Sequence, residues 1–182
     1  MIKVSLPRAE YSEDIVQKGD LYCKYICPTI SEDTVSAYEL AFSHYPTAEE
    51  IEAAKAREIP FYKSVMISNI EAYDSSSAVN GFLINDNEVW VDRTVRASQM
   101  TAILSAEILE KSDVTLAFGG VSYTLAIADA KEMLATIESY ALDVNNVTIA
   151  HKNTIMNSNS LETILAFDYT NGYPEKPSFE LS

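Results

Sequence analysis

The side chains best suited to nucleophilic or metal chemistry are two cysteines and two histidines, and their spacing does not gather them into a site. Cys23 and Cys27 are separated by three residues, and the tyrosines and isoleucine around them favour a strand. In a strand the two thiols lie about 13 Å apart, too far for a disulfide, whereas in a helix they would be neighbours. A metal site would need two more ligands, and only His44 and His151 are present. We therefore expect two reduced, partly buried thiols and no metal.

Acid–base chemistry has equally weak support. His151 could act as a base if it paired with Asp143 or Glu138, but its place on an apolar helical stripe is more typical of a packing histidine. Acidic pairs such as Glu49-Glu50 are sequence neighbours, as at helix starts and solvated surfaces. Gly119-Gly120 lacks the lysine and the strand–loop–helix order of a phosphate loop. No nucleophile elbow or H-E-x-x-H motif occurs. We expect no catalytic residue, no cofactor and no enzymatic activity.

The strongly negative charge of the chain disfavours nucleic acid as a partner. The formal net charge of the 182 residues is −14, and Lys and Arg do not cluster. Such a surface repels phosphate backbones, so we expect no nucleic-acid binding and interpret the acidity as a source of solubility. The first seven residues lack the long apolar stretch of a secretory signal, and no apolar run approaches the length of a membrane span. We therefore expect a protein made in the cytosol that does not bind a membrane.

The rest of the chain is organised around a hairpin predicted over residues 113–126. Gly119-Gly120 separates two alternating runs, and both central positions of a type I′ turn need a positive φ. The register predicts three facing pairs on one apolar face: Phe118–Val121, Leu116–Tyr123 and Val114–Leu125. Burial of this face could contribute on the order of 10 kcal/mol before chain entropy is counted.

One long helix is predicted to cover that face. Apolar residues recur at steps of three and four over residues 127–157. The stripe comprises Met133, Leu134, Ile137, Tyr140, Ala141, Val144, Val147, His151 and Ile155. Such a helix is about 46 Å long, so either the domain is elongated or the helix breaks near Asn145-Asn146.

Residues 1–59 are predicted to form a β-rich N-terminal subdomain with a short helix. Strands are expected over residues 2–6, 21–27 and 35–42, with a loop over 8–14, a turn over 16–20 and Pro28 ending the second strand. For residues 35–42 a helix is the alternative to a strand, but this segment runs into Pro46 without a C-cap. Thr47 and Glu50 form a capping box that begins a helix, which Pro60 ends or kinks.

Residues 60–182 are predicted to form the second domain: a helix over 61–73, a hairpin, a helix, the glycine-tipped hairpin, the long helix and a docked tail. The first hairpin spans 82–91 with Asp86-Asn87 at its tip, and Asp92 caps the helix that follows, to about Lys111. Its inward residues are expected to be Val95, Met100, Ile103, Leu104 and Ile108. The fold class is therefore α+β, with antiparallel hairpins packed on long amphipathic helices and helices on one face of an antiparallel sheet.

After a short helix that begins near Asn159, the chain ends in a turn-rich segment with aromatic residues between prolines. Rings of this kind bury a large area at low entropic cost, so this segment is more typical of a packed or partner-bound tail than of a disordered one. The possible protein-interface residues are Tyr169, Tyr173, Pro174 and Phe179.

Several motifs taken together carry a resemblance to a known family. They are Glu71-Ala-Tyr73-Asp74-Ser75-Ser-Ser77-Ala-Val79-Asn80-Gly-Phe82, then Val89-Trp90-Val91-Asp92 with Arg96, the Gly-Gly hairpin, and the ending Phe167-Asp168-Tyr169-Thr170-Asn-Gly172-Tyr173-Pro174-Glu175-Lys176. Over residues 60–180 they resemble an uncharacterised domain of unknown function that recurs in tail-region and tail-fibre-associated proteins of bacteriophages and prophages, often of Bacteroides-type hosts. The segment 42–51 is similar to one that often precedes that domain. The family often ends in Pro-Glu-Lys-Leu, whereas Pro177 follows Lys176 here.

The resemblance implies a virion protein of the tail, baseplate or fibre region that acts through contacts with other virion proteins, in several copies or as a homo-oligomer. The family has no established activity, so no catalytic residue is carried over. The alternative is a tail-fibre assembly chaperone that acts in the infected cell and is absent from the mature particle. A small glycan-cleaving enzyme is a distant third, because the sequence does not place two carboxylates at a defined separation.

Overall fold

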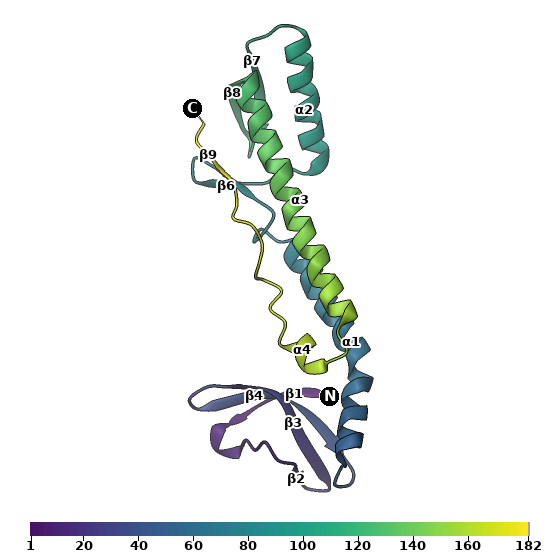
Figure 1. Ribbon diagram of the computed structural model, residues 1–182. Coiled ribbons are helices and arrows are strands. Elements are labelled where there is room, and N and C mark those ends of the chain that lie inside the picture. Colours follow the sequence, from purple (N-terminus) through teal and green to yellow (C-terminus); the bar gives the residue numbers. More distant parts are fainter. Residues whose placement is uncertain (182) are drawn as a thin grey trace. The chain divides into compact units, whose positions relative to one another are not determined.

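The computed structural model describes residues 1–181 and has the predicted α+β architecture (Figure 1). The chain divides into two compact units. The first comprises Met1–Asn69 and Lys152–Tyr169, and the second comprises Ile70–His151 and the chain from Thr170 onward. The predicted division after residue 59 and the division at residues 69/70 both fall within one helix, Ala48–Asp74.

The first unit contains a four-stranded antiparallel sheet in the order β1-β4-β3-β2. Its strands are β1 (Ile2–Pro7), β2 (Val16–Lys18), β3 (Leu21–Ile30) and β4 (Thr34–Phe42), with a 3-10 turn at Arg8–Glu10. Because successive side chains of a strand point to opposite faces, each face of the sheet has its own buried cluster. One face buries Tyr25 and Val35, and on the other Leu40 packs against Ala54 and Leu161 from two helices. The strand predicted over 35–42 is confirmed, whereas the turn expected over 16–20 begins with the short strand β2.

Pro28 does not end β3, which corrects the prediction. The strand continues to Ile30 through a bulge, where the register with β4 shifts between Ile26 and Thr29. Cys27 adopts φ +50° at this bulge. Bulges accept a proline because one residue leaves the ladder of backbone hydrogen bonds, so the missing N–H of Pro28 costs little there.

The helix α1 (Ala48–Asp74) begins at the predicted capping box. The Thr47 hydroxyl accepts from the Glu50 N–H at 3.2 Å, and the Glu50 carboxylate accepts from the Thr47 N–H at 2.8 Å. The helix continues through Pro60, so of the two predicted alternatives the ending is wrong, and the segment predicted as a separate helix over 61–73 belongs to α1. An interior proline costs about 3 kcal/mol. Packing along the helix, from Ala54 to the fully buried Ile70, outweighs that cost.

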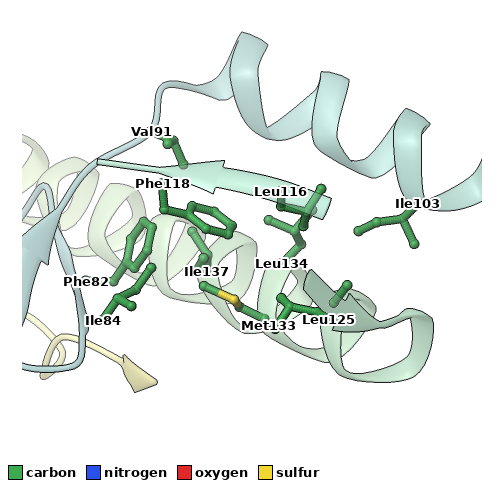
Figure 2. Close-up of a cluster of buried hydrophobic side chains, with 11 residues drawn as sticks. Phe82, Ile84, Val91, Ile103, Leu116, Phe118, Leu125, Met133, Leu134 and Ile137 are labelled. Atoms are coloured by element: carbon green, nitrogen blue, oxygen red, sulfur yellow. The ribbon is translucent and has the colours of Figure 1, made fainter. Parts of the chain in front are cut away.

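The second unit contains the glycine-tipped hairpin in the predicted register. Its strands are β7 (Asp113–Phe118) and β8 (Val121–Ala126), and Gly119 and Gly120 both have positive φ. The helix α3 (Ile127–Asn157) follows and is unbroken at Asn145-Asn146. The predicted cover is confirmed in part: Leu116, Phe118 and Leu125 of the hairpin and Met133, Leu134 and Ile137 of α3 belong to one buried cluster (Figure 2). That cluster includes Phe82, Ile84, Ile103, Leu116, Phe118, Leu125, Met133, Leu134 and Ile137. Val121 of the predicted face is instead 52% exposed, and Tyr140 and Val144 of the stripe belong to another cluster.

The first hairpin of this unit is shifted from the prediction. Strands β5 (Phe82–Ile84) and β6 (Asn87–Val89) pair Phe82 with Val89, and the turn residues are Asn85 and Asp86 rather than Asp86 and Asn87. Both turn residues have positive φ, which Asn and Asp tolerate. The hairpins do not join into the single sheet that we expected. β5 instead pairs in parallel with β9 (Ser178–Phe179), and β7–β8 is a separate ribbon.

The helix α2 (Arg93–Ile108) begins at Asp92, as predicted, with the carboxylate accepting from the Val95 N–H at 2.9 Å. Its inner face was predicted wrongly for three of five residues: Val95, Leu104 and Ile108 are exposed. The buried positions are Arg96, Gln99, Ile103 and Ala106. The last short helix, α4 (Leu161–Leu165), is capped by Ser160.

Candidate functional site

The tail residue Tyr173 packs against its own chain. Its ring lies 5.4 Å from that of Tyr73 and 5.5 Å, edge to face, from the His151 imidazole. Its hydroxyl shares a 3.1 Å hydrogen bond with the Thr148 hydroxyl. His151 is thus a half-buried packing residue in this unit, and only part of the Tyr173 ring is left to meet a partner.

Phe179 is anchored in the same unit. It packs edge to face on Phe82, with 6.1 Å between ring centroids, and its carbonyl accepts from the Asn85 N–H at 3.0 Å. The Asn85 side chain also bonds the Leu181 N–H and carbonyl, each at 2.7 Å. These bonds join segments about a hundred residues apart in the sequence and fix the tail as a strand of the unit.

The other two predicted interface residues are half-buried. Pro174 lines a shallow pocket of about 320 Å³ with Tyr140, Asp143 and Pro177. Tyr169 belongs to the first unit, whereas the other three residues belong to the second. The contact of these four residues with a partner stays a prediction.

A buried arginine organises the start of α2. Arg96 is 6% exposed, and its Nε donates to Glu138 Oε1 at 2.7 Å while an Nη donates to the Val91 carbonyl at 2.7 Å. Its guanidinium carbon lies 5.1 Å from the centre of the Trp90 ring, a cation–π distance. A pocket of about 260 Å³ beside it is also lined by Arg93 and Met100. Because these donors already bind Glu138 and Val91, the arrangement braces the unit.

Residues of the other quoted motifs also contact one another. Asp74 accepts from the Thr148 hydroxyl at 2.7 Å and its backbone carbonyl accepts from the Asn80 amide. The Tyr140 hydroxyl donates to the Val79 carbonyl at 2.7 Å, and burial raises the pKa of that phenol. These polar groups fix the turn after α1 onto α3, so the motifs have structural roles in this unit.

A polar cluster in the first unit joins Lys55 to Glu162 at 2.6 Å and to Glu52 at 2.9 Å, beside a pocket of about 440 Å³. Burial alone would lower the pKa of Lys55, but the two ion pairs outweigh it and raise that pKa. Burial, with Glu162 adding to it, raises the pKa of the nearby Cys27 thiol. A thiol with a raised pKa is a weak nucleophile at neutral pH.

The remaining candidates behave as ordinary surface groups. His44 lies 2.8 Å from Glu50 on the exposed start of α1. Among residues 1–181, no group of three or more His, Cys, Asp or Glu side chains could hold a metal ion. Over the same residues no helix is long and apolar enough to cross a membrane.

The most unusual exposed surface lies on α2. We call it the outer face of α2, formed by Thr94, Ala97, Thr101, Leu104 and Ile108. These residues recur at steps of three and four, so they lie on one side of the helix, opposite Gln99, Ile103 and Ala106. All five are exposed, with Leu104 at 45% and Ile108 at 80%. No charged residue belongs to this face.

Three hydroxyl groups on and beside this face donate hydrogen bonds within the helix. Ser98, Thr101 and Ser105 each donate to the backbone carbonyl four residues earlier, at 3.0, 3.0 and 2.8 Å. These three hydroxyl donors therefore keep their partners when water is removed, which reduces the cost of covering the face.

Sequence reasoning missed both features of α2. It assigned Leu104 and Ile108 to the core because they are apolar, and it gave Arg96 no role beyond the resemblance. The available signal was the position of Arg96, four residues after the Asp92 cap and close in sequence to the single tryptophan.

No protein-family model, no curated protein and no solved structure matches this chain.

Proposed function

We propose that this chain is a non-enzymatic structural or adaptor protein of a bacteriophage particle, in the tail, baseplate or fibre region. It acts through contacts with other virion proteins. The motif resemblance supports the phage context, and the outer face of α2 supports the mode of action.

The outer face of α2 is the observation that carries this proposal. On a chain with net charge −14, an exposed helix face without charge is not explained by solubility. The neighbouring Leu109, 68% exposed, extends the apolar surface beyond Ile108. Contiguous apolar surface of this kind marks interaction sites in soluble proteins. Its covering is favourable by about 25 cal/mol per Å² of apolar area.

The test uses particles of the phage or prophage that encodes the chain, purified and analysed by quantitative mass spectrometry. We expect peptides of this chain in the mature particle. Their absence from particles would refute the virion role. If the chain then co-purified with fibre protein from infected cells, that result would support the assembly chaperone instead.

A matched pair of variants tests the surface. Particles are made by a phage lacking the native gene and supplied with Leu104→Glu/Ile108→Glu or with Ile30→Glu. Ile30 lies in the other unit and, at 46% exposed, resembles Leu104 in exposure. We expect the double variant to enter particles at least about tenfold less and Ile30→Glu to enter normally. Normal incorporation of a folded double variant would show that this face is not the contact.

A further inference from the structure

The irregular segment between α4 and β9 contains an asparagine–glycine pair (Figure 1). Asn171 and Gly172 are both exposed, and the Gly172 N–H donates to Asn171 Oδ1 at 2.8 Å. Because a C=O bond is about 1.23 Å long, the Asn171 Cγ lies within about 4 Å of the Gly172 nitrogen. Gly172 has φ +86° and no Cβ, so no side chain of its own screens that nitrogen from the carboxamide.

A backbone nitrogen held close to a side-chain carboxamide carbon is placed for cyclisation. The Gly172 nitrogen loses its proton to water or hydroxide and forms a bond to Asn171 Cγ. The bond from Cγ to Nδ2 then breaks, and ammonia leaves with the proton that it takes up. Water next adds to one of the two carbonyl carbons of the resulting five-membered imide and opens the ring. The product is aspartate, or isoaspartate, in which the backbone runs through the side-chain carboxyl carbon.

We propose that Asn171 is a site of spontaneous deamidation in the folded chain, and that its isoaspartate product loosens the docked tail. Isoaspartate adds one backbone atom two residues before Tyr173. The Tyr173 ring lies 5.4 Å from that of Tyr73, and its hydroxyl bonds to Thr148 at 3.1 Å. A longer backbone at residue 171 displaces Tyr173 from these contacts. This inference goes beyond the proposed function and does not depend on it.

The chain carries its own control, because one other asparagine precedes a glycine. Asn80 is half-buried, Gly81 is buried, and the Asn80 Nδ2 donates to the Asp74 carbonyl. Rotation of the Asn80 carboxamide toward the Gly81 nitrogen would break that bond. A Cβ on Gly81 would lie 2.7 Å from Glu88 Oε1, so the backbone there is closely packed and water has little access. The fold therefore protects Asn80 and leaves Asn171 reactive.

The first experiment incubates the purified full chain at mildly alkaline pH and follows both asparagines by peptide mass spectrometry. In the folded chain we expect Asn171 to convert at least about tenfold faster than Asn80, because only Asn171 has an accessible attacking nitrogen. In concentrated urea the two rates should converge, since both pairs then lack a fixed environment. Conversion of Asn171 in the folded chain no faster than that of Asn80 would overturn the proposal.

A substitution assigns the reaction to the side chain. Asn171→Gln keeps the amide but would require a six-membered ring, which forms far more slowly. We expect ion-exchange chromatography to resolve a new, more negative species from the incubated natural chain and at least about tenfold less of it from Asn171→Gln. An equal amount from both chains would overturn the assignment to Asn171.

Hydrogen exchange then measures the docking of the tail. The Asn85 N–H donates to the Phe179 carbonyl at 3.0 Å, and the Leu83 N–H donates to the Pro177 carbonyl at 2.9 Å. In the isoaspartate species these two amides should exchange at least about fivefold faster than in the unmodified chain. Asn171→Asp is the matched control, because it carries the new charge without the added backbone atom, and should exchange as the unmodified chain does. Unchanged exchange in the isoaspartate species, or equally fast exchange in Asn171→Asp, would overturn the role assigned to the longer backbone.

Discussion

Replacement of the buried arginine Arg96 by methionine should destabilise the second unit, and the structure allows the cost to be worked out. Methionine fills much of the space of the arginine stem, so little cavity results. The change removes the guanidinium that bonds the Val91 carbonyl at 2.7 Å and Glu138 at 2.7 Å. Val91 is 8% exposed, so its carbonyl loses a partner with little access to water.

The magnitude follows from three contributions. A hydrogen bond to a charged group contributes about 1.5–3 kcal/mol, and this loss dominates because Val91 is buried. The ion pair adds at most about 1 kcal/mol, since the Glu138 side chain is 49% exposed and solvent screens it. The contact with the Trp90 ring adds about 0.5–1 kcal/mol. Relief from desolvating the guanidinium offsets part of the sum, so we expect a net loss of about 2–3 kcal/mol.

Trp90 supplies the assay, because it is the single tryptophan of the chain and lies against Arg96. Urea unfolding followed by tryptophan fluorescence reports the second unit, and circular dichroism reports the whole chain. The matched control is Arg93→Met, one turn earlier and exposed, which should cost less than about 0.5 kcal/mol. If Arg96→Met costs no more than Arg93→Met, the bracing role assigned to Arg96 is wrong.

Three further predictions concern other parts of the fold. Pro60→Ala should stabilise the chain by about 1–3 kcal/mol in thermal or urea unfolding, because it restores an interior helix hydrogen bond; destabilisation would mean that the proline fixes a needed local geometry. Phe179→Ala should cost about 2 kcal/mol by Trp90 fluorescence, since it removes the ring on Phe82; no loss would show that the tail is not anchored there. Burial would raise the pKa of Glu162, but its ion pair with Lys55 lowers it below the ordinary 4.5. The stabilisation that ionised Glu162 gives the folded chain is therefore present above about pH 4.5 and lost as the pH falls through the folded pKa. Glu162→Gln should accordingly reduce the loss of unfolding free energy on the acid side. An unchanged dependence of unfolding free energy on pH would contradict the ion pair.

Local signals explain the parts of the fold that the sequence predicted well. Gly119-Gly120 imposes its turn because two consecutive positive φ angles admit few other residues, and that turn then determines the register of both strands. Thr47 and Asp92 begin their helices through bonds to backbone groups within three residues. The α3 stripe was predictable because its partner hairpin lies immediately before it in the chain.

The errors arose where distant contacts outweighed a local preference. Packing carries α1 through Pro60, and a bulge carries β3 through Pro28. The pairing of β9 with β5 joins segments about a hundred residues apart, so nothing near either strand indicates it. On α2, hydropathy favours Leu104 and Ile108 for the core. The rotation of the helix is instead set by Arg96, which must reach Val91 and Glu138.

That rotation links the stability of the second unit to its proposed contacts. Because Arg96 takes an inward position, the opposite side of α2 is left to face water with Leu104 and Ile108 on it. If leucine stood on the buried side of α2 and arginine on its outer face, a monomer would be more stable, because the apolar side chain would be buried and the charge solvated. An arginine held inside while apolar side chains stay outside is therefore expected where the outer face has a partner. A charged substitution there should impair assembly and leave unfolding of the purified chain unchanged, whereas Arg96→Met should do the reverse.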